Sequence, residues 1–359
     1  MRNGWTGGQY SVFRVLLAAG LLILFARTAP AAVDHPADTS SWVDLLAWCP
    51  AWAVITLAAI ASAALAVGCC DTVAVVFCLY LLACLHAHAA IKLAPALVAW
   101  SVLLARHLLV PPAPFGSLPA CARPDPDGGW MLPGPLHFAT WATLLALLIW
   151  EGWSAWSAGE GVRRAGAAWL LLVPLALIPR VRPAAWAGVV LVALVLVLFS
   201  WPRNDVFALV FLALGAFDPA WIPPRRADSV ETFFYDGSCG LCHRSVRAAL
   251  AEDRHPETLR FAPLQGETFR DRYDDAGAFP DSIVLETAAG PLVKSTATIA
   301  LCARFGGLWR AGAVLGGLLP RVIRDALYDA VAANRRRLFK QPDDACPVVA
   351  PELRDRFLD

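Results

Sequence analysis

The sequence VETFFYDGSCGLCHRSV, residues 230–246, decides the fold of the C-terminal part of this chain. Its first six residues are β-branched or aromatic apart from one glutamate, which is typical of a strand. A turn follows, and Cys239 and Cys242 then stand, with two residues between them, at the start of a helix expected over 240–252. The order of strand, turn, cysteine pair and helix predicts an α/β domain with the cysteines at a helix N-terminus.

The residues that follow continue the alternation of strands and helices. We expect strands at 230–235, 259–262, 282–286 and 292–294, and helices at 267–273, 296–305, 308–316 and 321–338. The order βαβαββα, followed by a helical extension, indicates an α/β domain.

The position of Cys239 favours dithiol redox chemistry. Backbone N–H groups and the helix dipole at a helix N-terminus stabilise a thiolate there. Cys242 comes one turn later on the same face, where it can attack a mixed disulfide on Cys239. We therefore expect Cys239 to be the nucleophile and Cys242 the resolving thiol.

Two other chemistries fit the same residues. The two cysteines and His243 form the CxxCH pattern of c-type haem attachment. However, the C-terminal part has no methionine, and its only other histidine is His255. It therefore offers few residues that could be the second axial ligand of a haem iron. A zinc site needs four ligands and would draw on Cys302 or Cys346, because no second closely spaced pair exists. The dithiol is favoured over haem, zinc and chemically inert cysteines.

The N-terminal part has the composition of a membrane domain. Only 21 of residues 1–222 are Asp, Glu, Lys or Arg, whereas 38 of the 137 residues from 223 onward are charged. An ordinary soluble domain is about a quarter charged, so only the second part resembles one. The net charge of +1 is too small to indicate binding to nucleic acid. We predict a membrane domain at 1–222, a linker at 223–229 and an α/β domain at 230–359.

Apolar runs that span or nearly span a bilayer recur through the N-terminal part. They lie near 11–29, 45–67, 72–91, 93–110, 136–157, 166–179, 184–201 and 205–222. We therefore expect a multi-pass inner-membrane protein with about eight helices, the first of them uncleaved.

The charges around the first apolar run predict the orientation in the membrane. Arg2 and Arg14 stand at its start, and Asp34, Asp38 and Asp44 follow it. The positive-inside rule then places the N-terminus in the cytoplasm. An even number of helices places the C-terminal domain in the cytoplasm as well, and one helix more or fewer reverses this answer.

The stretch FFYDGSCGLCHRSV resembles the signature of the DCC family of thiol-disulfide oxidoreductases. The family pattern Tyr-Asp-Gly-x-Cys-x-x-Cys corresponds here to Tyr235, Asp236, Gly237, Cys239 and Cys242. Further matches follow in order along 230–358, namely DSIV at 281–284, Lys294-Ser295 with Ala297, Ala333-Asn334-Arg335, Cys346 and Arg356-Phe357. The resemblance implies a thioredoxin-like fold with the two cysteines as the redox centre.

The resemblance also implies roles for neighbouring residues. Asp236 would lie beside the dithiol, either as a proton acceptor for the resolving thiol or as a turn and cap residue. The position that a cis-proline holds in thioredoxins falls at Asp281 or Ser282, because Pro280 comes one or two residues early. Cys346 is either a third redox thiol or a buried small residue, and burial is favoured.

The stretches SVFRVLLAAG at 11–20 and FDPAWIPP at 217–224 are similar to membrane domains of the HTTM type, which are distantly related to vitamin K-dependent carboxylase. In this part, CLHAHAAIK holds His86, His88 and Lys92. Ionisable residues at membrane depth are functional candidates. His88 and Lys92 would share a helix face, although Lys92 could instead snorkel to the interface.

Together these features predict a membrane-anchored thiol-disulfide oxidoreductase that reduces, oxidises or exchanges disulfides through Cys239 and Cys242. The alternative is a membrane transporter or lipid-modifying enzyme whose C-terminal domain is a redox sensor or assembly module. No metal and no cofactor beyond the redox-active disulfide is expected, and the sequence shows no quinone site. The expected partners are the lipid bilayer and a protein or small-molecule disulfide, with no nucleic acid.

Overall fold

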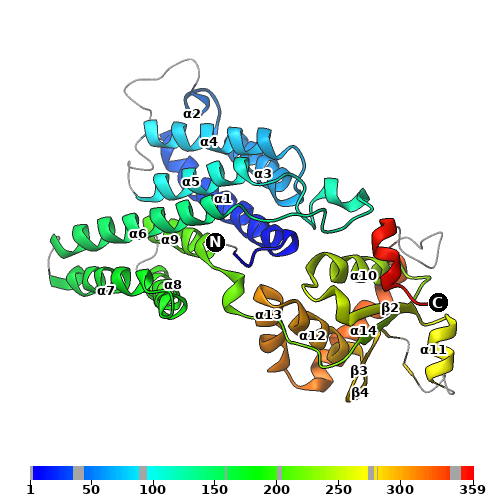
Figure 1. Cartoon of the computed structure of the whole chain (residues 1–359). Coiled ribbons are helices and arrows are strands. Elements are labelled where there is room, and N and C mark those ends of the chain that lie inside the picture. The colour runs from blue at the N-terminus through cyan, green and yellow to red at the C-terminus, as the bar shows by residue number, and fades with distance from the viewer. Residues whose placement is uncertain are drawn as a thin grey trace. The chain divides into compact units, whose positions relative to one another are not determined.

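The computed structural model of the chain is mostly helical, with one small mixed sheet in its C-terminal part (Figure 1). The structure describes residues 3–34, 44–88, 95–157, 160–199, 204–273, 279–280, 282–339 and 349–359. The chain forms two units. The first comprises Met1–Asn3, Ser11–Ala113 and Leu132–Phe217, and the second comprises Gly4–Tyr10, Pro114–Met131 and Asp218–Asp359.

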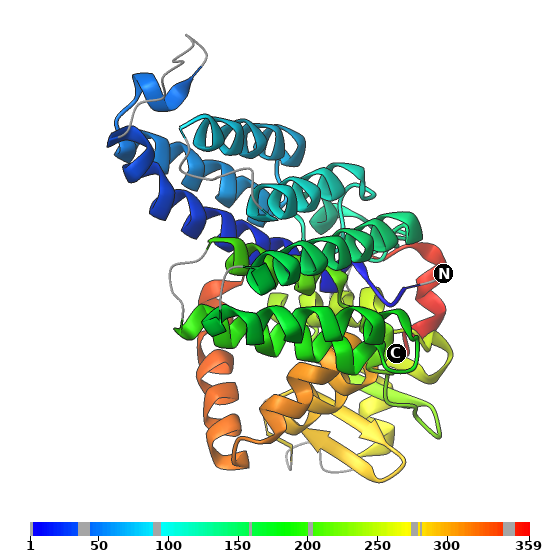
Figure 2. The same ribbon diagram turned by 90° about the vertical axis from the view of Figure 1, so that its left-hand side faces the viewer.

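The first unit is built from apolar helices, coloured blue to green in Figure 2. They are α1 (Gly7–Asp34), α2 (Leu45–Trp48), α3 (Ala51–Val67), α4 (Asp71–Ala87), α5 (Pro95–Leu109), α6 (Gly134–Ser157), α7 (Glu160–Leu177), α8 (Arg182–Phe199) and α9 (Asn204–Ala216). Each of the eight expected apolar runs is therefore largely helical, which confirms the helices as secondary structure.

Two helix boundaries differ from the prediction. The run 45–67 is split in two, because Pro50 is the N-cap of α3 and has no N–H with which to continue α2. In the run 205–222, the α-helix ends at Ala216. There Asp218 accepts the backbone N–H of Ala220 over 2.9 Å and starts a short 3-10 turn at Pro219–Trp221.

Within the described ranges, one helical stretch, Gly7–Val33, has the length and apolar composition needed to cross a membrane. Six further apolar helical stretches are 10–17 residues long. A helix needs about 20 residues to span the hydrocarbon core, so these are short for a perpendicular crossing. The prediction of about eight membrane spans therefore stays a prediction.

The second unit contains the α/β domain, and its order of elements confirms the predicted βαβαββα pattern and helical extension. The elements are β1 (Glu231–Tyr235), α10 (Gly240–Glu252), β2 (Leu259–Pro263), α11 (Glu267–Arg272), β3 (Val284–Thr287), β4 (Gly290–Val293), α12 (Lys294–Phe305), α13 (Gly307–Gly317) and α14 (Arg321–Leu338). The strand order is β2-β1-β3-β4. β1 pairs in parallel with β2 across the α10 connection and antiparallel with β3.

The central strand β1 is buried along its whole length because both faces of the sheet are covered. On one face, Phe233 and Tyr235 pack with residues of α10 and α12 such as Val246 and Leu301. On the other face, Phe234 packs edge-on to Phe269 of α11 with ring centroids 5.0 Å apart. The alternation of side chains along a strand produces these two separate cores.

The β3–β4 hairpin begins later than predicted. The expected strand 282–286 is found at Val284–Thr287, so Ser282 precedes the strand. The expected strand 292–294 is found at Gly290–Val293. Gly290 adopts a φ of 113°, which lets the chain turn immediately before Pro291, and Lys294 already begins α12.

Two segments distant in sequence belong to the second unit together with the α/β domain. The side-chain oxygen of Gln9 accepts the backbone N–H of Leu308 over 2.9 Å. The Arg247 guanidinium donates to the Arg123 carbonyl over 2.6 Å, and Pro124 accepts the N–H of Ala350 over 3.0 Å. In the sequence-based division, residues 4–10 and 114–131 lie in the membrane domain, whereas by packing they group with the C-terminal unit.

Candidate functional site

The turn between β1 and α10 positions Cys239 at the N-terminus of the helix. The strand ends at Tyr235, and the backbone N–H of Cys239 donates to the Asp236 carbonyl over 3.1 Å, which closes the turn. Cys239 is the N-cap residue, and its Sγ accepts the backbone N–H of Cys242 over 3.4 Å. A sulfur atom thus occupies the place where the side-chain oxygen of Ser or Asp usually caps a helix.

Cys242 follows one turn further along α10. It is 4% exposed and Cys239 is 3% exposed, and both are free thiols. Burial, together with the hydrogen bond and the charge of Cys239, raises the pKa of Cys242 to about 12, whereas the Arg335 guanidinium acts to lower it. The second thiol therefore holds its proton while the first sulfur lies among the N–H groups of the helix.

The Asp236 carboxylate organises the turn. Its Oδ1 accepts the backbone N–H of Ser238 (2.9 Å), the Ser238 hydroxyl (2.7 Å) and the Gln265 amide (3.0 Å). Its Oδ2 pairs with the Arg335 guanidinium over 3.1 Å. Burial acts to raise the pKa of Asp236, but these hydrogen bonds and the charge of Arg335 outweigh it and leave the pKa below its usual value. Asp236 is therefore an ionised acceptor that fixes the turn.

His243 also supports the turn. Its Nε2 lies 3.0 Å from the Gly237 carbonyl oxygen, and its ring meets Tyr235 edge-on at a centroid distance of 5.9 Å. Gly237 further donates its N–H to the Gln265 side chain over 3.2 Å. In the part of the chain that the structure describes, no three His, Cys, Asp or Glu side chains gather as a metal-binding group.

The other predicted site residues are only partly covered by the structure. Ser282 is 1% exposed, and its hydroxyl donates to the Ile283 carbonyl over 3.1 Å rather than to a cysteine. Asp281 and Cys346 lie outside the described residues. Cys302 is a half-buried free thiol on α12.

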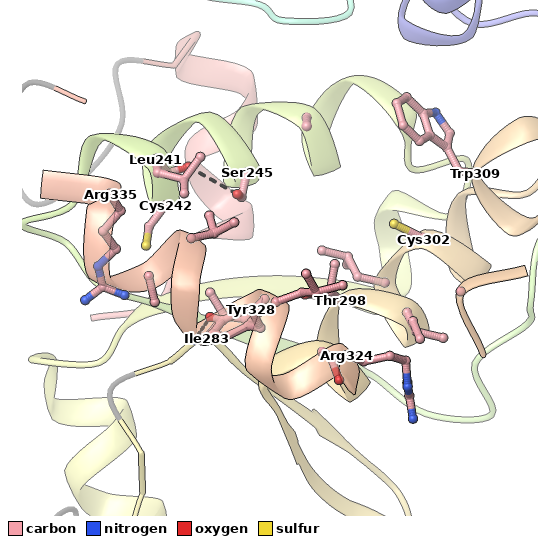
Figure 3. A pocket seen from close by; sticks show the side chains of 18 of the residues that line it. Leu241, Cys242, Ser245, Ile283, Thr298, Cys302, Trp309, Arg324, Tyr328 and Arg335 are labelled. Atoms are coloured by element: carbon pink, nitrogen blue, oxygen red, sulfur yellow. Dashed lines mark hydrogen bonds between the residues drawn. The ribbon is translucent and has the colours of Figure 1, made fainter. Parts of the chain in front are cut away.

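A cavity of about 530 Å³ adjoins the dithiol (Figure 3). Its walls come from α10, α12, α13, α14 and the segment before β3, and they are mostly apolar. Cys242 and Arg335 lie at one end of it, and Arg324 and Trp309 lie away from them. Cys242 is therefore part of the wall of a space large enough for a small molecule.

A sealed and empty cavity of this size would be costly. At about 24 cal/mol per Å³ of void, it would destabilise the fold by on the order of 10 kcal/mol. This is comparable with the entire stability of a typical domain, about 5–15 kcal/mol. The cavity is therefore a space that solvent or a ligand enters.

Arg335 and Gln265 belong to the site although neither was a candidate from the sequence. Both contact Asp236, and Arg335 also acts on the pKa of Cys242. The only signal for Arg335 was its place in the Ala-Asn-Arg run that matches the DCC pattern. No sequence pattern pointed to Gln265.

Glu252, the last residue of α10, is a second unpredicted member of the cavity wall. It is 1% exposed. Its carboxylate accepts the backbone N–H of Gly8 (2.8 Å), the Trp309 indole N–H (2.5 Å) and the Thr6 hydroxyl. Burial raises the pKa of Glu252 to about 7, against the opposing effect of these hydrogen bonds.

We expect the thermal stability of the protein to fall as the pH rises from about 5 to 7. The pKa of Glu252 is about 7 in the folded chain against an ordinary value of 4.5, so folding favours the protonated form. Stability is then highest below the unfolded pKa and falls until the folded pKa is passed, by about 3 kcal/mol in total. The unfolding midpoint, measured between pH 5 and 7.5, should lose this slope in Glu252→Gln.

A matched substitution provides the control for this pH dependence. Glu267 is an exposed glutamate in the same unit, so Glu267→Gln should keep the slope of the native protein. An unchanged slope in Glu252→Gln would contradict the assignment.

The structure describes part of the predicted membrane site. α4 ends at Ala87 with His88 as its C-cap, so the expected helix over 72–91 is shorter than predicted. The His88 Nε2 lies 2.5 Å from the Asp44 Oδ2, and both side chains are buried. His86 is half-buried in the last turn of α4, and Lys92 lies outside the described residues. The structure thus brings His88 to Asp44.

Comparisons with known proteins concern the C-terminal part. A family model described as DCC1-like thiol-disulfide oxidoreductase matches residues 233–341. The uncharacterized protein YuxK of Bacillus subtilis (strain 168) is 32% identical over 132 residues, which cover 93% of that protein and 36% of this chain. The chloroplastic DCC family protein At1g52590 of Arabidopsis thaliana is 29% identical over 119 residues, 69% of that protein and 32% of this chain. No solved structure matches.

The family match begins within β1 and ends just after α14, so it contains the turn, both cysteines and Arg335. The relative from Bacillus subtilis is matched over nearly its whole length. On this basis the chain belongs, through its residues 233–341, to the DCC1-like thiol-disulfide oxidoreductase family.

Proposed function

We propose that the protein is a membrane-anchored thiol-disulfide oxidoreductase with Cys239 as nucleophile and Cys242 as resolving thiol. The observation that carries this proposal is the Cys239 sulfur at the N-cap of α10, accepting the backbone N–H of Cys242. Membership of the family supports the general redox role. The first apolar helix, Gly7–Val33, supports the membrane anchor.

The exchange proceeds in two balanced steps. The Cys239 thiolate attacks one sulfur of the substrate disulfide, forms a mixed disulfide and releases the other substrate sulfur as a thiolate. Cys242 then loses its proton and attacks the Cys239 sulfur, which releases the second substrate thiolate. The substrate gains two electrons, and the Cys239–Cys242 pair is oxidised to a disulfide. A thiol reductant restores the dithiol, and the reverse sequence oxidises a substrate dithiol.

The surrounding residues hold this geometry. Asp236 accepts four hydrogen bonds or ion-pair contacts as a carboxylate, which favours the turn and cap role over that of a proton acceptor. Arg335 connects this carboxylate to α14, and its charge opposes the rise in the pKa of Cys242. The charge of Arg335 therefore eases the deprotonation of the resolving thiol.

A redox titration of the purified full-length protein tests the proposed chemistry. The protein is equilibrated at defined ratios of oxidised to reduced dithiothreitol, alkylated and digested. We expect Cys239 and Cys242 to lose their reactivity together in one two-electron transition, while Cys302 stays alkylated. Independent titration of the two cysteines, or no pairing at any ratio, would refute the dithiol.

The side of the membrane is a separate part of the proposal, based on the positive-inside rule and an even number of spans. Ala289 lies exposed in the β3–β4 turn, so Ala289→Cys offers a site for labelling. We expect a membrane-impermeant maleimide to modify this variant only after cells are permeabilised, relative to the parent protein. Labelling in intact cells would place the dithiol outside the cytoplasm, where oxidase or isomerase work is favoured.

A second candidate function gives the helical unit the main role, as a transporter or lipid-modifying enzyme of HTTM-like type with a redox-sensing C-terminal domain. The buried His88–Asp44 pair favours it, because paired ionisable groups among apolar helices often mark functional sites. The two candidates differ in the phenotype of the Cys239→Ser/Cys242→Ser double variant. A cellular phenotype that survives this double substitution would favour the second candidate.

A further inference from the structure

Helix α14 is attached to the rest of its unit through polar contacts. Arg335 pairs over 3.1 Å with the carboxylate of the active-site turn. The Tyr328 hydroxyl accepts the backbone N–H of Ile283 over 3.1 Å, and Asp325 accepts the Ser295 hydroxyl over 2.5 Å. These three contacts recur at intervals of three and seven residues along one side of the helix, so its polar side faces inward.

Exposed apolar side chains lie on the outer surface of α14 and at the end of α13, among exposed charges such as Arg321. Val322 is 82% exposed, Leu318 is 76% exposed and Leu327 is 59% exposed. Large exposed apolar side chains that lie together often have a binding role. Those on α14 and at the end of α13 are available for contact with apolar material.

The cavity beside the dithiol lies between α14 and α12 and reaches this apolar surface. Its inner wall includes Leu301 and Phe305 of α12, which are 6% and 5% exposed. Leu319, Leu327 and Val331 belong both to the cavity wall and to the exposed apolar surface. An apolar molecule can therefore pass from that surface into the cavity without leaving apolar surroundings.

Two arginines of α14 differ in how their charge is compensated. Arg324 and Arg335 both line the cavity and are separated by three helical turns, about 16 Å. Arg335 is neutralised by Asp236 over 3.1 Å. The buried Nε of Arg324 has no hydrogen-bond partner among the residues that the structure describes. Arg324, in the wall at the end of the cavity away from Cys242, therefore has hydrogen-bonding capacity left for an anionic group.

We propose that this cavity binds an acyl chain with an anionic head group, with the chain between α12 and α14 and the head on Arg324. A volume of about 530 Å³ falls within the range of small-molecule sites. Transfer of the chain from water into the apolar cavity is favourable. A guanidinium binds a carboxylate or phosphate through paired hydrogen bonds. A free fatty acid and an anionic phospholipid both carry this chemistry.

The site goes beyond the proposed redox function and does not rest on it. Cys242 lies in the cavity wall, so an acyl chain would cover the resolving thiol. Binding is therefore measured in the Cys239→Ser variant of the full-length protein, which has no dithiol. A failure of binding and a failure of disulfide exchange then remain distinguishable.

Photo-crosslinking in nanodiscs of neutral phosphatidylcholine tests the proposal. One arm uses palmitic acid with a diazirine on its chain, and the other uses phosphatidylglycerol with the same group on one acyl chain. We expect crosslinks at Leu301 or Phe305, which line the inner wall. The arm with the stronger labelling identifies the source of the ligand, and competition by unlabelled palmitic acid should remove it.

Two arginines on the same helix provide a matched comparison. Arg324→Gln should lower the labelling of the inner wall about tenfold, which corresponds to the loss of a charge-assisted hydrogen bond. Arg321 is 64% exposed at its side chain and pairs with Asp325, so Arg321→Gln should leave the labelling unchanged. Equal labelling in all three proteins would overturn the role of Arg324.

Filling the cavity tests the site independently of charge. Ala332 and Ala248 both line it, and Ala332→Phe or Ala248→Phe should abolish labelling of the inner wall. Each variant is accepted only if its unfolding midpoint stays close to that of the parent protein. Labelling confined to Val322 and Leu318, and unaffected by either phenylalanine, would overturn the proposal in favour of bilayer contact by the outer surface alone.

Discussion

Replacement of Cys239 by serine is expected to lower the rate of disulfide exchange to the uncatalysed background. The Cys239 sulfur is the atom at the N-cap of α10, and in the proposed mechanism its thiolate forms the first bond to the substrate. A serine oxygen can still cap the helix, so the fold should persist while the nucleophile is lost. By comparison with other enzymes that lose a nucleophile, the decrease should reach at least about 10³-fold.

The partner substitution should have a different signature. Cys242→Ser keeps the nucleophile but removes the thiol that resolves the mixed disulfide, so a covalent adduct on Cys239 should accumulate. Mass spectrometry after exposure to oxidised glutathione would detect it. Cys302 lines the same cavity as a free thiol, and Cys302→Ser should retain full activity. Activity that survives in Cys239→Ser, or is lost in Cys302→Ser, would refute the assignment.

Replacement of Arg335 by leucine is expected to destabilise the second unit by about 3–5 kcal/mol, the usual cost of removing one partner from a buried ion pair. Arg335 is 3% exposed, and its loss leaves the 5% exposed Asp236 without its counterion. The unfolding midpoint should fall by about 10 °C. The pKa of Asp236 should rise, because the charge of Arg335 helps to hold it low.

The Arg335 prediction has a control substitution on the same helix and can be tested further in a double-mutant cycle. Arg337 lies exposed on the same helix, and Arg337→Leu should change the midpoint by no more than a degree or two. The double variant Asp236→Asn/Arg335→Leu should recover part of the loss, because no charge is then left buried. Alkylation of Cys242 should also slow in Arg335→Leu, since the guanidinium acts to lower the pKa of Cys242. Equal midpoints for the two leucine variants would contradict the prediction.

The local parts of the site could be predicted from the sequence. The apolar run before Asp236 and the glycines on either side of Cys239 indicate a strand, a turn and a helix start, and β1 and α10 are found there. These signals are local because strand patterning, turn residues and capping involve neighbours in the chain. The exact boundaries are less well predicted, since β4 begins at Gly290 rather than at residue 292.

The partners of the site could not be predicted, because they depend on tertiary packing. Arg335 reaches Asp236 across 99 residues, and Thr6 reaches Glu252 across 246 residues. No periodicity connects residues so far apart. The contact of His88 with Asp44 is of the same kind, because the two residues are 44 positions apart and no local pattern connects them.

The membership of residues 4–10 in the second unit has a consequence for the order of folding. Gln9 contacts Leu308 across 299 residues, and Gly8 contacts Glu252 across 244 residues. Pairings of such sequence separation form slowly, because a long loop must close before they contribute stability. During synthesis, residues 4–10 leave the ribosome long before these partners exist. The second unit therefore reaches its final packing only after Leu308 has been synthesised and has met Gln9.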